Sequence, residues 1–129
     1  MRTTDRTAAW DPDLVPDERG RTARPTPDCP VEVALAAVAG RWTTLVLREL
    51  MHGPRSFGEL REQLPDLTAK VLTERLRTLE GRGLVEHVRI AGFPPRGRYD
   101  LTGMGMALRP LLLELYRTGS ALLAGAEPH

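Results

Sequence analysis

Residue types that commonly carry out catalysis or hold metal ions are scarce in this sequence. The 129 residues include a single cysteine (Cys29), three histidines (His52, His87 and His129) and two serines (Ser56 and Ser120). No cysteine and histidine residues have the spacing of zinc ligands, and no glycine-rich phosphate loop or nucleophile elbow is present. We therefore expect neither an enzyme nor a bound metal or cofactor.

Positive charge is the chemical feature that stands out, because it is concentrated in one stretch. The net charge of the chain is only +1. Between Leu67 and Arg98, however, seven basic side chains stand against three acidic ones, a local excess of four. A basic segment of this kind is typical of proteins that bind nucleic-acid phosphates. Whether these side chains can reach a phosphate depends on the helices and strands that carry them.

The sequence before and within this stretch predicts four helices. Prolines and glycines separate four segments that have apolar residues at helical spacing. Ser56 and Glu59 form the pattern of a capping box before the third helix, and Thr68 is a suitable N-cap for the fourth. The helices are expected at residues 30–39, 41–52, 57–64 and 69–80.

The fourth helix is expected to have one apolar and one basic face. At 100° per residue, Leu72, Leu76 and Leu79 lie within about 40° of one direction, which predicts a buried stripe. Lys70 and Arg77 lie on the opposite side. A helix-turn-helix places its second helix in the major groove of DNA, so we predict this motif for the third and fourth helices. Thr68 either caps the helix or contacts a phosphate. The predicted DNA-contact set of the helix is Thr68, Lys70, Thr73, Arg75 and Arg77.

A β-hairpin with a long, proline-containing tip follows the fourth helix. Its strands are predicted at residues 86–90 and 98–101. The two consecutive prolines stiffen the tip, so that less conformational entropy is lost when the tip docks. Arginines beside the tip supply positive charge for phosphates or for a narrow minor groove. The predicted DNA-contact set of this wing is Arg89, Pro94, Pro95, Arg96 and Arg98.

A long helix is predicted from Thr102 to about Leu123. Pro110 lies inside it and is expected to kink it near Met106, whose carbonyl loses its usual donor. The helix is apolar over more than one stripe, which a small domain cannot cover, so a second copy of the chain is the expected cover. The resulting fold is mainly α, of the α+β class: a winged helix-turn-helix with a two-stranded β-wing and a long C-terminal dimerisation helix.

Five stretches of the sequence support a family resemblance: CPVEVAL, AGRWTTLVLRELMHGPRSFGELREQLP, KVLTERLRTLEGRGLVEH, FPPRGRYDLT and GMALRPLL. Through them the chain resembles, from Cys29 to about Gly119, the HxlR family of bacterial winged-helix transcription regulators, relatives of the MarR group. The resemblance implies a homodimer that is built from the first and last helices and binds inverted-repeat operators near promoters. The dimer interface expected from these helices contains Val31, Leu35, Leu112, Leu115 and Leu122.

Cys29 precedes the first helix, whose N-terminus favours a thiolate, while Asp28 and Glu32 oppose this effect. Several relatives in the HxlR family sense oxidants or electrophiles through a cysteine just before Pro-Val, the position of Cys29. The alternative is a small buried residue that packs at the start of the helix. Because the chain has no second cysteine, a sensor would form an intermolecular disulfide or a mixed thiol adduct.

Residues 1–28 contain four prolines and many charges, so we expect a flexible N-terminal arm there and the winged-helix domain at residues 29–129. We find no signal sequence and no apolar run near the ~20 residues of a membrane span, and expect a cytoplasmic protein. The expected partners are double-stranded operator DNA, a second copy of the chain and a small-molecule or oxidant effector, with no membrane. The alternative is a winged-helix module that binds another protein and does not contact DNA.

Overall fold

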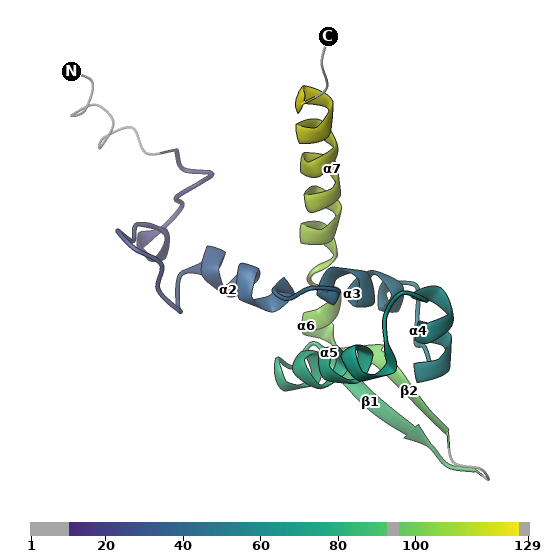
Figure 1. Cartoon of the computed structure of the whole chain (residues 1–129). Helices are drawn as coiled ribbons and strands as arrows, with labels where there is room; N and C mark the ends of the chain where they lie inside the picture. The colour runs from purple at the N-terminus through teal and green to yellow at the C-terminus, as the bar shows by residue number, and fades with distance from the viewer. Residues whose placement is uncertain (1–10, 93–95, 127–129) are drawn as a thin grey trace, which may run out of the picture. The chain divides into compact units, whose positions relative to one another are not determined.

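The structure is a computed structural model that describes residues 11–92 and 96–126. The chain divides into two compact units, at residues 1–39 and 40–129. Among the described residues, no single helix is both long enough and apolar enough to cross a membrane. The elements in chain order (Figure 1) are the 3-10 helix η1 (Glu18–Gly20), α2 (Pro30–Val38), α3 (Thr43–Met51), α4 (Phe57–Gln63), α5 (Ala69–Gly81), β1 (Val85–Ile90), β2 (Arg96–Leu101), α6 (Gly103–Met106) and α7 (Arg109–Ala126).

The first unit contains η1 and α2. Asp17 caps η1, because its carboxylate accepts hydrogen bonds from the backbone and side chain of Arg19 at 3.0 and 3.2 Å. These bonds lower the pKa of Asp17. Cys29 is the N-cap of α2, with Pro30 in the first turn as the sequence predicts. The division into a flexible arm and a domain at Cys29 stays a prediction.

The core of the second unit is almost entirely leucine. α3, α4 and α5 each turn leucines inward, and the turn after α4 and the start of β1 add more. The leucine stripe predicted for α5 is confirmed. The buried apolar side chains of this unit are Val46, Leu47, Leu50, Leu60, Leu64, Leu67, Leu72, Leu76, Leu79, Leu84, Val85 and Leu101.

Side-chain caps fix the start of both helices of the helix-turn-helix. The Ser56 hydroxyl accepts from the Glu59 amide at 3.1 Å, and the Glu59 carboxylate accepts from the Ser56 amide at 2.8 Å, which confirms the capping box. The bond from the Ser56 amide also lowers the pKa of Glu59. The Thr68 hydroxyl accepts from the Val71 amide at 3.2 Å and caps α5. Leu67, fully buried between the helices, anchors the turn that joins them.

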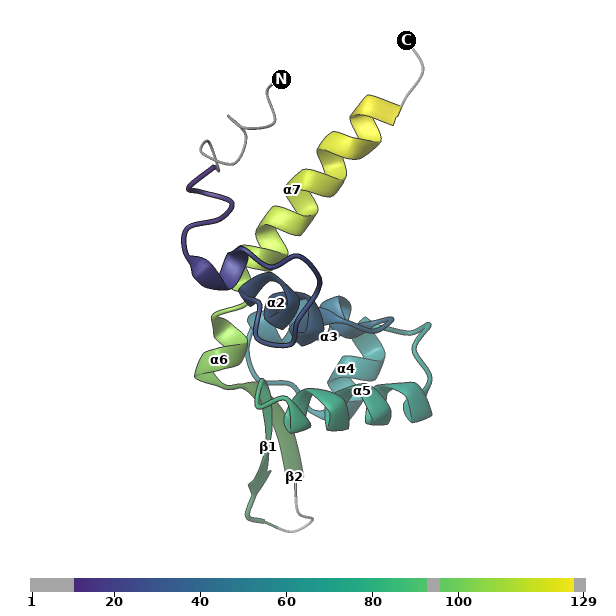
Figure 2. The same cartoon turned by 90° about the vertical axis from the view of Figure 1, so that its left-hand side faces the viewer.

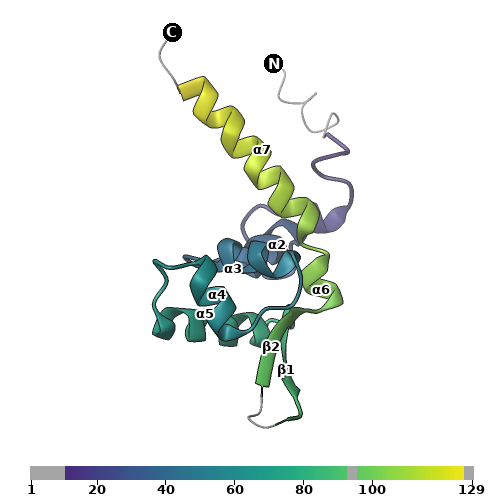
Figure 3. The same cartoon turned by 90° about the vertical axis from the view of Figure 1, so that its right-hand side faces the viewer.

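The hairpin is a two-stranded antiparallel sheet whose base is attached to the helices. β1 and β2 pair in the register Val85↔Leu101 to Ile90↔Arg96. Tyr99 also forms a β-bridge with Arg55, just before α4: the Arg55 amide donates to the Tyr99 carbonyl at 3.0 Å, and the Tyr99 amide donates to the Arg55 carbonyl at 2.7 Å. The free end of the hairpin and α7 leave the helical body on opposite sides (Figures 2 and 3).

The predicted single helix from Thr102 to about Leu123 is wrong, because the structure has two helices there. α6 ends at Met106, and α7 begins at Arg109 with Pro110 in its first turn. Proline has no amide to donate to the Met106 carbonyl and its ring would clash with that carbonyl, so the chain breaks instead of kinking. Proline is well tolerated in the first turn of the new helix.

α6 is held against the end of α5. The Thr102 hydroxyl caps α6 by accepting from the Gly105 amide at 3.1 Å, and it donates to the Gly83 carbonyl at 2.6 Å. A Cβ atom on Gly105 would overlap the carbonyl oxygen of Leu84. The close approach of α6 to the α5–β1 connection therefore requires glycine at residue 105.

Arg75 of α5, which is half-buried, stabilises the bend that precedes α3. Nε of Arg75 donates to the carbonyl of Arg41 at 2.6 Å. The bend places Trp42 at φ 77°, the one positive φ among the described non-glycine residues, and such backbone needs support from its surroundings. At 100° per residue, Arg75 lies about 70° from the centre of the leucine stripe, so its side chain can reach across to Arg41.

Replacing Arg75 with alanine should lower the free energy of unfolding by about 1–2 kcal/mol, because the Arg41 carbonyl loses a charged donor and the bend loses its support. Chemical denaturation monitored by circular dichroism measures this change. Arg77→Ala, on the exposed face of the same helix, is the matched control and should stay within about 0.5 kcal/mol of the unmodified protein. Equal effects of the two substitutions would contradict the structural role of Arg75.

Candidate nucleic-acid interface

The exposed face of α5 carries the charges that the sequence places there. Lys70, Glu74, Arg77 and Thr78 are exposed, whereas the leucines of the same helix are buried. No ion pair joins Lys70 or Arg77 to any residue that the structure describes. Both cations therefore remain available to phosphates or to base edges.

The other three predicted contact residues of this helix already have partners in the protein. The Thr68 hydroxyl caps the helix, and the Thr73 hydroxyl donates to the Ala69 carbonyl at 2.8 Å. Arg75 holds the Arg41 carbonyl and is half-buried. The structure thus gives all three a local structural role, and their contact with DNA stays a prediction.

The wing divides its arginines between two faces. Residues that pair directly across an antiparallel sheet lie on the same face, and neighbours along a strand alternate. Arg96 pairs with Ile90 and Arg98 with Val88, so both arginines share one face, whereas Arg89 pairs with Gly97 on the other. The three arginines are exposed. Pro94 and Pro95, to which we assign the stiffness of the tip, lie outside the described residues.

Arg96 and Arg98 border a groove between the wing and the start of α4. Ile90, Phe57 and the capping residue Ser56 also line it. On the α4 wall the capping box already uses the Ser56 and Glu59 amides, and the Glu59 carboxylate lines the groove as well. The positive charge of the groove therefore comes from the two arginines. The wall formed by the wing is thus the side of the groove that is suited to a phosphate.

An aromatic stack on the opposite face of the wing was not predicted. The rings of His87 and Tyr99 stack with centroids 4.3 Å apart and an angle of 8° between their planes. The Tyr99 amide bonds to Arg55 and not to β1, so His87 and Tyr99 form a pair without hydrogen bonds, in which side chains approach closely. A Cβ on Gly97 would lie 2.6 Å from Nε2 of His87, so Gly97 makes room for the imidazole. Gly97 is expected in the tip, before the second predicted strand, whereas β2 begins at Arg96, so the sequence offered no signal for this contact.

Charged side chains of both α5 and the wing act on the phenol of Tyr99. Burial raises the pKa of Tyr99, and the negative charge of Glu80 raises it further, while Arg89 and Arg77 oppose the rise. Arg77 of α5 and Arg89 of β1 therefore lie close enough to the phenol to act on it.

The predicted dimer residues and Cys29 have contrasting environments. The side chains of Val31, Leu35, Leu115 and Leu122 are exposed, with Leu122 at 69 %, while Leu112 is half-buried. α7 has no buried residue over its 18 residues. Cys29 is a free cysteine with only 7 % of its surface exposed. The structure thus leaves apolar surface on α2 and α7 open and encloses the thiol.

Comparisons with known proteins agree with this architecture. The family model for the HxlR-like helix-turn-helix matches residues 37–126. An uncharacterized HTH-type transcriptional regulator of Synechocystis, sll1512, is 38 % identical over 92 residues, which cover 71 % of this chain and 68 % of the relative.

Two solved structures are also similar. The redox regulator HypR in its reduced form matches with a TM-score of 0.67 and 33 % identity, over 71 % of this chain and 91 % of HypR. The reduced form of the transcriptional regulator YodB from Bacillus subtilis matches with a TM-score of 0.64 and 34 % identity, over 69 % of this chain and 88 % of YodB. A quinone-bound form of YodB is known as well. With its capped helix-turn-helix, basic wing and matching family model, the chain belongs to the HxlR family of winged-helix transcription regulators.

Proposed function

We propose that the protein binds double-stranded operator DNA as a homodimer, with α5 in the major groove and the wing on the adjacent backbone or minor groove. The observation that carries this proposal is the pairing of two features on α5. Its leucine face is completely buried, and its opposite face presents Lys70 and Arg77, which form no ion pair with any residue that the structure describes. A helix held in this way by its neighbours is suited to enter a groove 12 Å wide, the approximate width of the major groove.

The wing supports the same function through charge. Arg96 and Arg98 face the groove beside the capped start of α4, so a phosphate would meet two guanidinium groups on the wall that the wing forms. Contacts of this kind position a protein on the duplex, while the side chains of α5 read base edges. Such a regulator would act in the cytoplasm, on the chromosome.

Self-association is supported by the apolar surface of α7. An 18-residue helix with no buried side chain gains little stability from the chain it belongs to. Leu115 and Leu122 lie seven residues apart, so they share one stripe that a second copy can cover. A homodimer would also place two copies of α5 about 34 Å apart, as an inverted repeat requires.

Redox control through Cys29 is the finer part of the proposal. HypR is a redox regulator and YodB has a quinone-bound form, and Cys29 lies at the start of a helix, where a thiolate is favoured. The burial of Cys29 means that an oxidant must wait for the start of α2 to open. The reaction should therefore be slower than that of an exposed thiol.

The double substitution of Arg96 and Arg98 by alanine should weaken binding to every duplex by a similar factor. Each phosphate contact that is lost lowers the slope of log K against log salt by ~0.9, so the slope should fall by up to about 1.8. Fluorescence anisotropy with a labelled duplex between ~50 and ~200 mM salt measures it. Arg117→Ala on α7 removes one positive charge outside the wing and should leave the slope unchanged. A double variant with the original affinity and slope would exclude this face of the wing from the contact.

The substitution Leu122→Asp should convert the dimer to a monomer, because it places a charge in the proposed apolar interface between the two copies of α7. Sedimentation velocity at micromolar concentration reports the change, and operator affinity should fall with it. Ala121→Asp is the control, since residue 121 is exposed and lies about 100° away around α7. A stable monomer in the unmodified protein, or a dimer that tolerates Leu122→Asp, would contradict the proposed assembly.

Treatment with a quinone should add one adduct per chain at Cys29 and reduce operator affinity. Intact-mass spectrometry and anisotropy follow the two events on the same sample. Cys29→Ser, which leaves the chain without any thiol, should bind DNA normally and resist the treatment. If the unmodified protein keeps its affinity after complete modification, Cys29 is a packing residue and not a sensor.

A further inference from the structure

Glu74 is an acidic side chain at the centre of the face that α5 turns outward, and it is exposed. At 100° per residue, the direction opposite to the leucine stripe lies about 15° from Glu74, about 25° from Lys70 and about 45° from Arg77. Along the helix axis Glu74 lies between the two cations, at roughly 6 and 4.5 Å from them. The carboxylate therefore projects straight out from the helix, with one cation on each side.

The carboxylate of Glu74 has no ionic partner among the described residues. Lys70 precedes it by four positions and Arg77 follows it by three, yet no ion pair joins it to either of them. These spacings permit such pairs, but a lysine four residues before a glutamate has the less favourable orientation. Ion pairing within α5 therefore does not account for an acid at this position.

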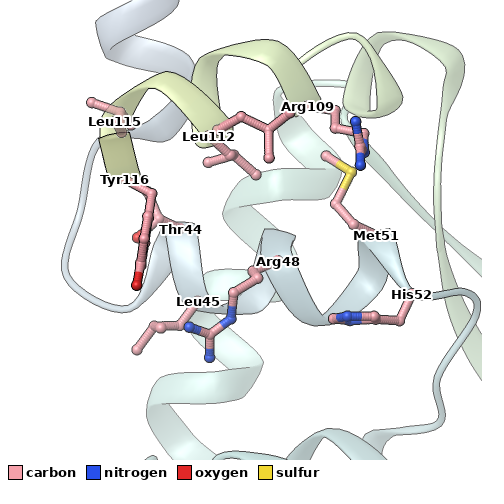
Figure 4. A pocket seen from close by; sticks show the side chains of 10 residues that line it. Thr44, Leu45, Arg48, Met51, His52, Arg109, Leu112, Leu115 and Tyr116 are labelled. Atoms are coloured by element: carbon pink, nitrogen blue, oxygen red, sulfur yellow. The ribbon is translucent and has the colours of Figure 1, made fainter. Parts of the chain in front are cut away.

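Arginines also gather around a cavity between α3 and α7. Figure 4 shows Arg48 of α3 and Arg109 of α7 among its lining side chains, together with Leu112 and Leu115 of the proposed dimer interface. No acidic side chain of the described residues lines this cavity. A carboxylate between cations is therefore a feature of the α5 face, and not of every cationic surface in this unit.

In the proposed complex with DNA, a carboxylate on this face needs a hydrogen-bond donor. Phosphates repel it, and so do the acceptors O6 and N7 of guanine and O4 of thymine. The donors that bases present in the major groove are N4 of cytosine and N6 of adenine. N6 of adenine stands beside the acceptor N7, whereas N4 of cytosine has no acceptor beside it on the same base. Cytosine is therefore the base that suits the carboxylate best.

We infer that Glu74 is a specificity-determining residue, which accepts a hydrogen bond from N4 of a cytosine in each operator half-site. The inference rests on the proposed function, because it needs α5 in the major groove. The guanine that pairs with this cytosine presents O6 and N7, which Lys70 or Arg77 can contact beside the carboxylate. One acid between two cations thus matches the donors and acceptors of a C·G pair and of its neighbours.

The carboxylate acts more by rejecting wrong sequences than by strengthening binding to the right one. At a site without the cytosine it meets phosphates and acceptors but no donor, so affinity falls. Removal of the acid should therefore have two opposite consequences, tighter binding to unrelated duplexes and loss of discrimination at one base pair. A residue with only a structural role would produce neither.

The test begins with the full-length protein and a pool of randomised duplexes, from which selection gives the preferred half-site. Fluorescence anisotropy then measures the affinity for this duplex and for duplexes with single replacements. Thymine in place of the cytosine should weaken binding at least about fivefold. The base 2-pyrimidinone, which lacks only the N4 amino group, should weaken it to a similar extent.

Three variants separate the contact from the charge. Glu74→Ala should lose the preference for cytosine, and Glu74→Gln should favour adenine, because its amide can bond to both N6 and N7. Both should bind an unrelated duplex more tightly than the unmodified protein does. Glu80→Gln removes the same charge from another exposed residue of α5, about 105° from the outward direction, and should keep the preference for cytosine. Because residue 74 is exposed, circular dichroism should show its variants to be folded.

An unchanged preference for cytosine in Glu74→Ala would overturn the inference. An equal response of Glu74→Ala and the unmodified protein to 2-pyrimidinone would overturn it as well, and so would a selected half-site that contains no cytosine. If the unmodified protein binds none of the duplexes, the proposed function fails and this inference fails with it. Sequence-specific binding that does not depend on residue 74 would refute this inference alone.

Discussion

The burial of the leucine stripe of α5 is the interaction on which the rest of the structure depends. Leu72, Leu76 and Leu79 are at most 1 % exposed, and burial of a leucine side chain contributes roughly 1.5–3 kcal/mol. Rotating α5 about its axis would expose these side chains, so the orientation of the helix is fixed. The same constraint determines that Lys70 and Arg77 face outward. A surface suited to a DNA groove is thus a direct consequence of how the core packs.

Two further attachments convert a packed helix into a defined binding surface. Arg75 joins α5 to the bend before α3, and the backbone bridge between Arg55 and Tyr99 joins the wing to the segment before α4. α5 and the wing are therefore fixed to the same small body at separate points. The outward cations of both can then be presented together, with little entropy lost on binding. α3 is central to this arrangement, because both the core and the bend involve it.

Local rules predicted most of the fold. The capping box at Ser56, the N-cap at Thr68 and the leucine spacing of α5 are short-range features, and each is confirmed. The role of Arg75 could not be predicted in this way, because its partner, Arg41, is distant in the sequence. The faces of the wing arginines could not be predicted either, because they depend on the pairing register of β1 and β2. The helical position of Arg75, close to the leucine stripe, could have indicated its structural role. Its positive charge instead favoured the interpretation as a DNA contact. The break at Pro110 shows that a proline can end one helix and begin another, a choice that helical periodicity does not decide.

We propose that the outward face of α5 and the Arg96–Arg98 face of the wing bind duplex DNA. Heteronuclear NMR of the labelled protein during titration with a duplex tests it most directly, residue by residue. We expect the largest shift changes at the amides of Lys70, Arg77, Arg96 and Arg98, with little change in α7 beyond Tyr116. Shift changes confined to α7 or α2, with none on α5, would contradict it.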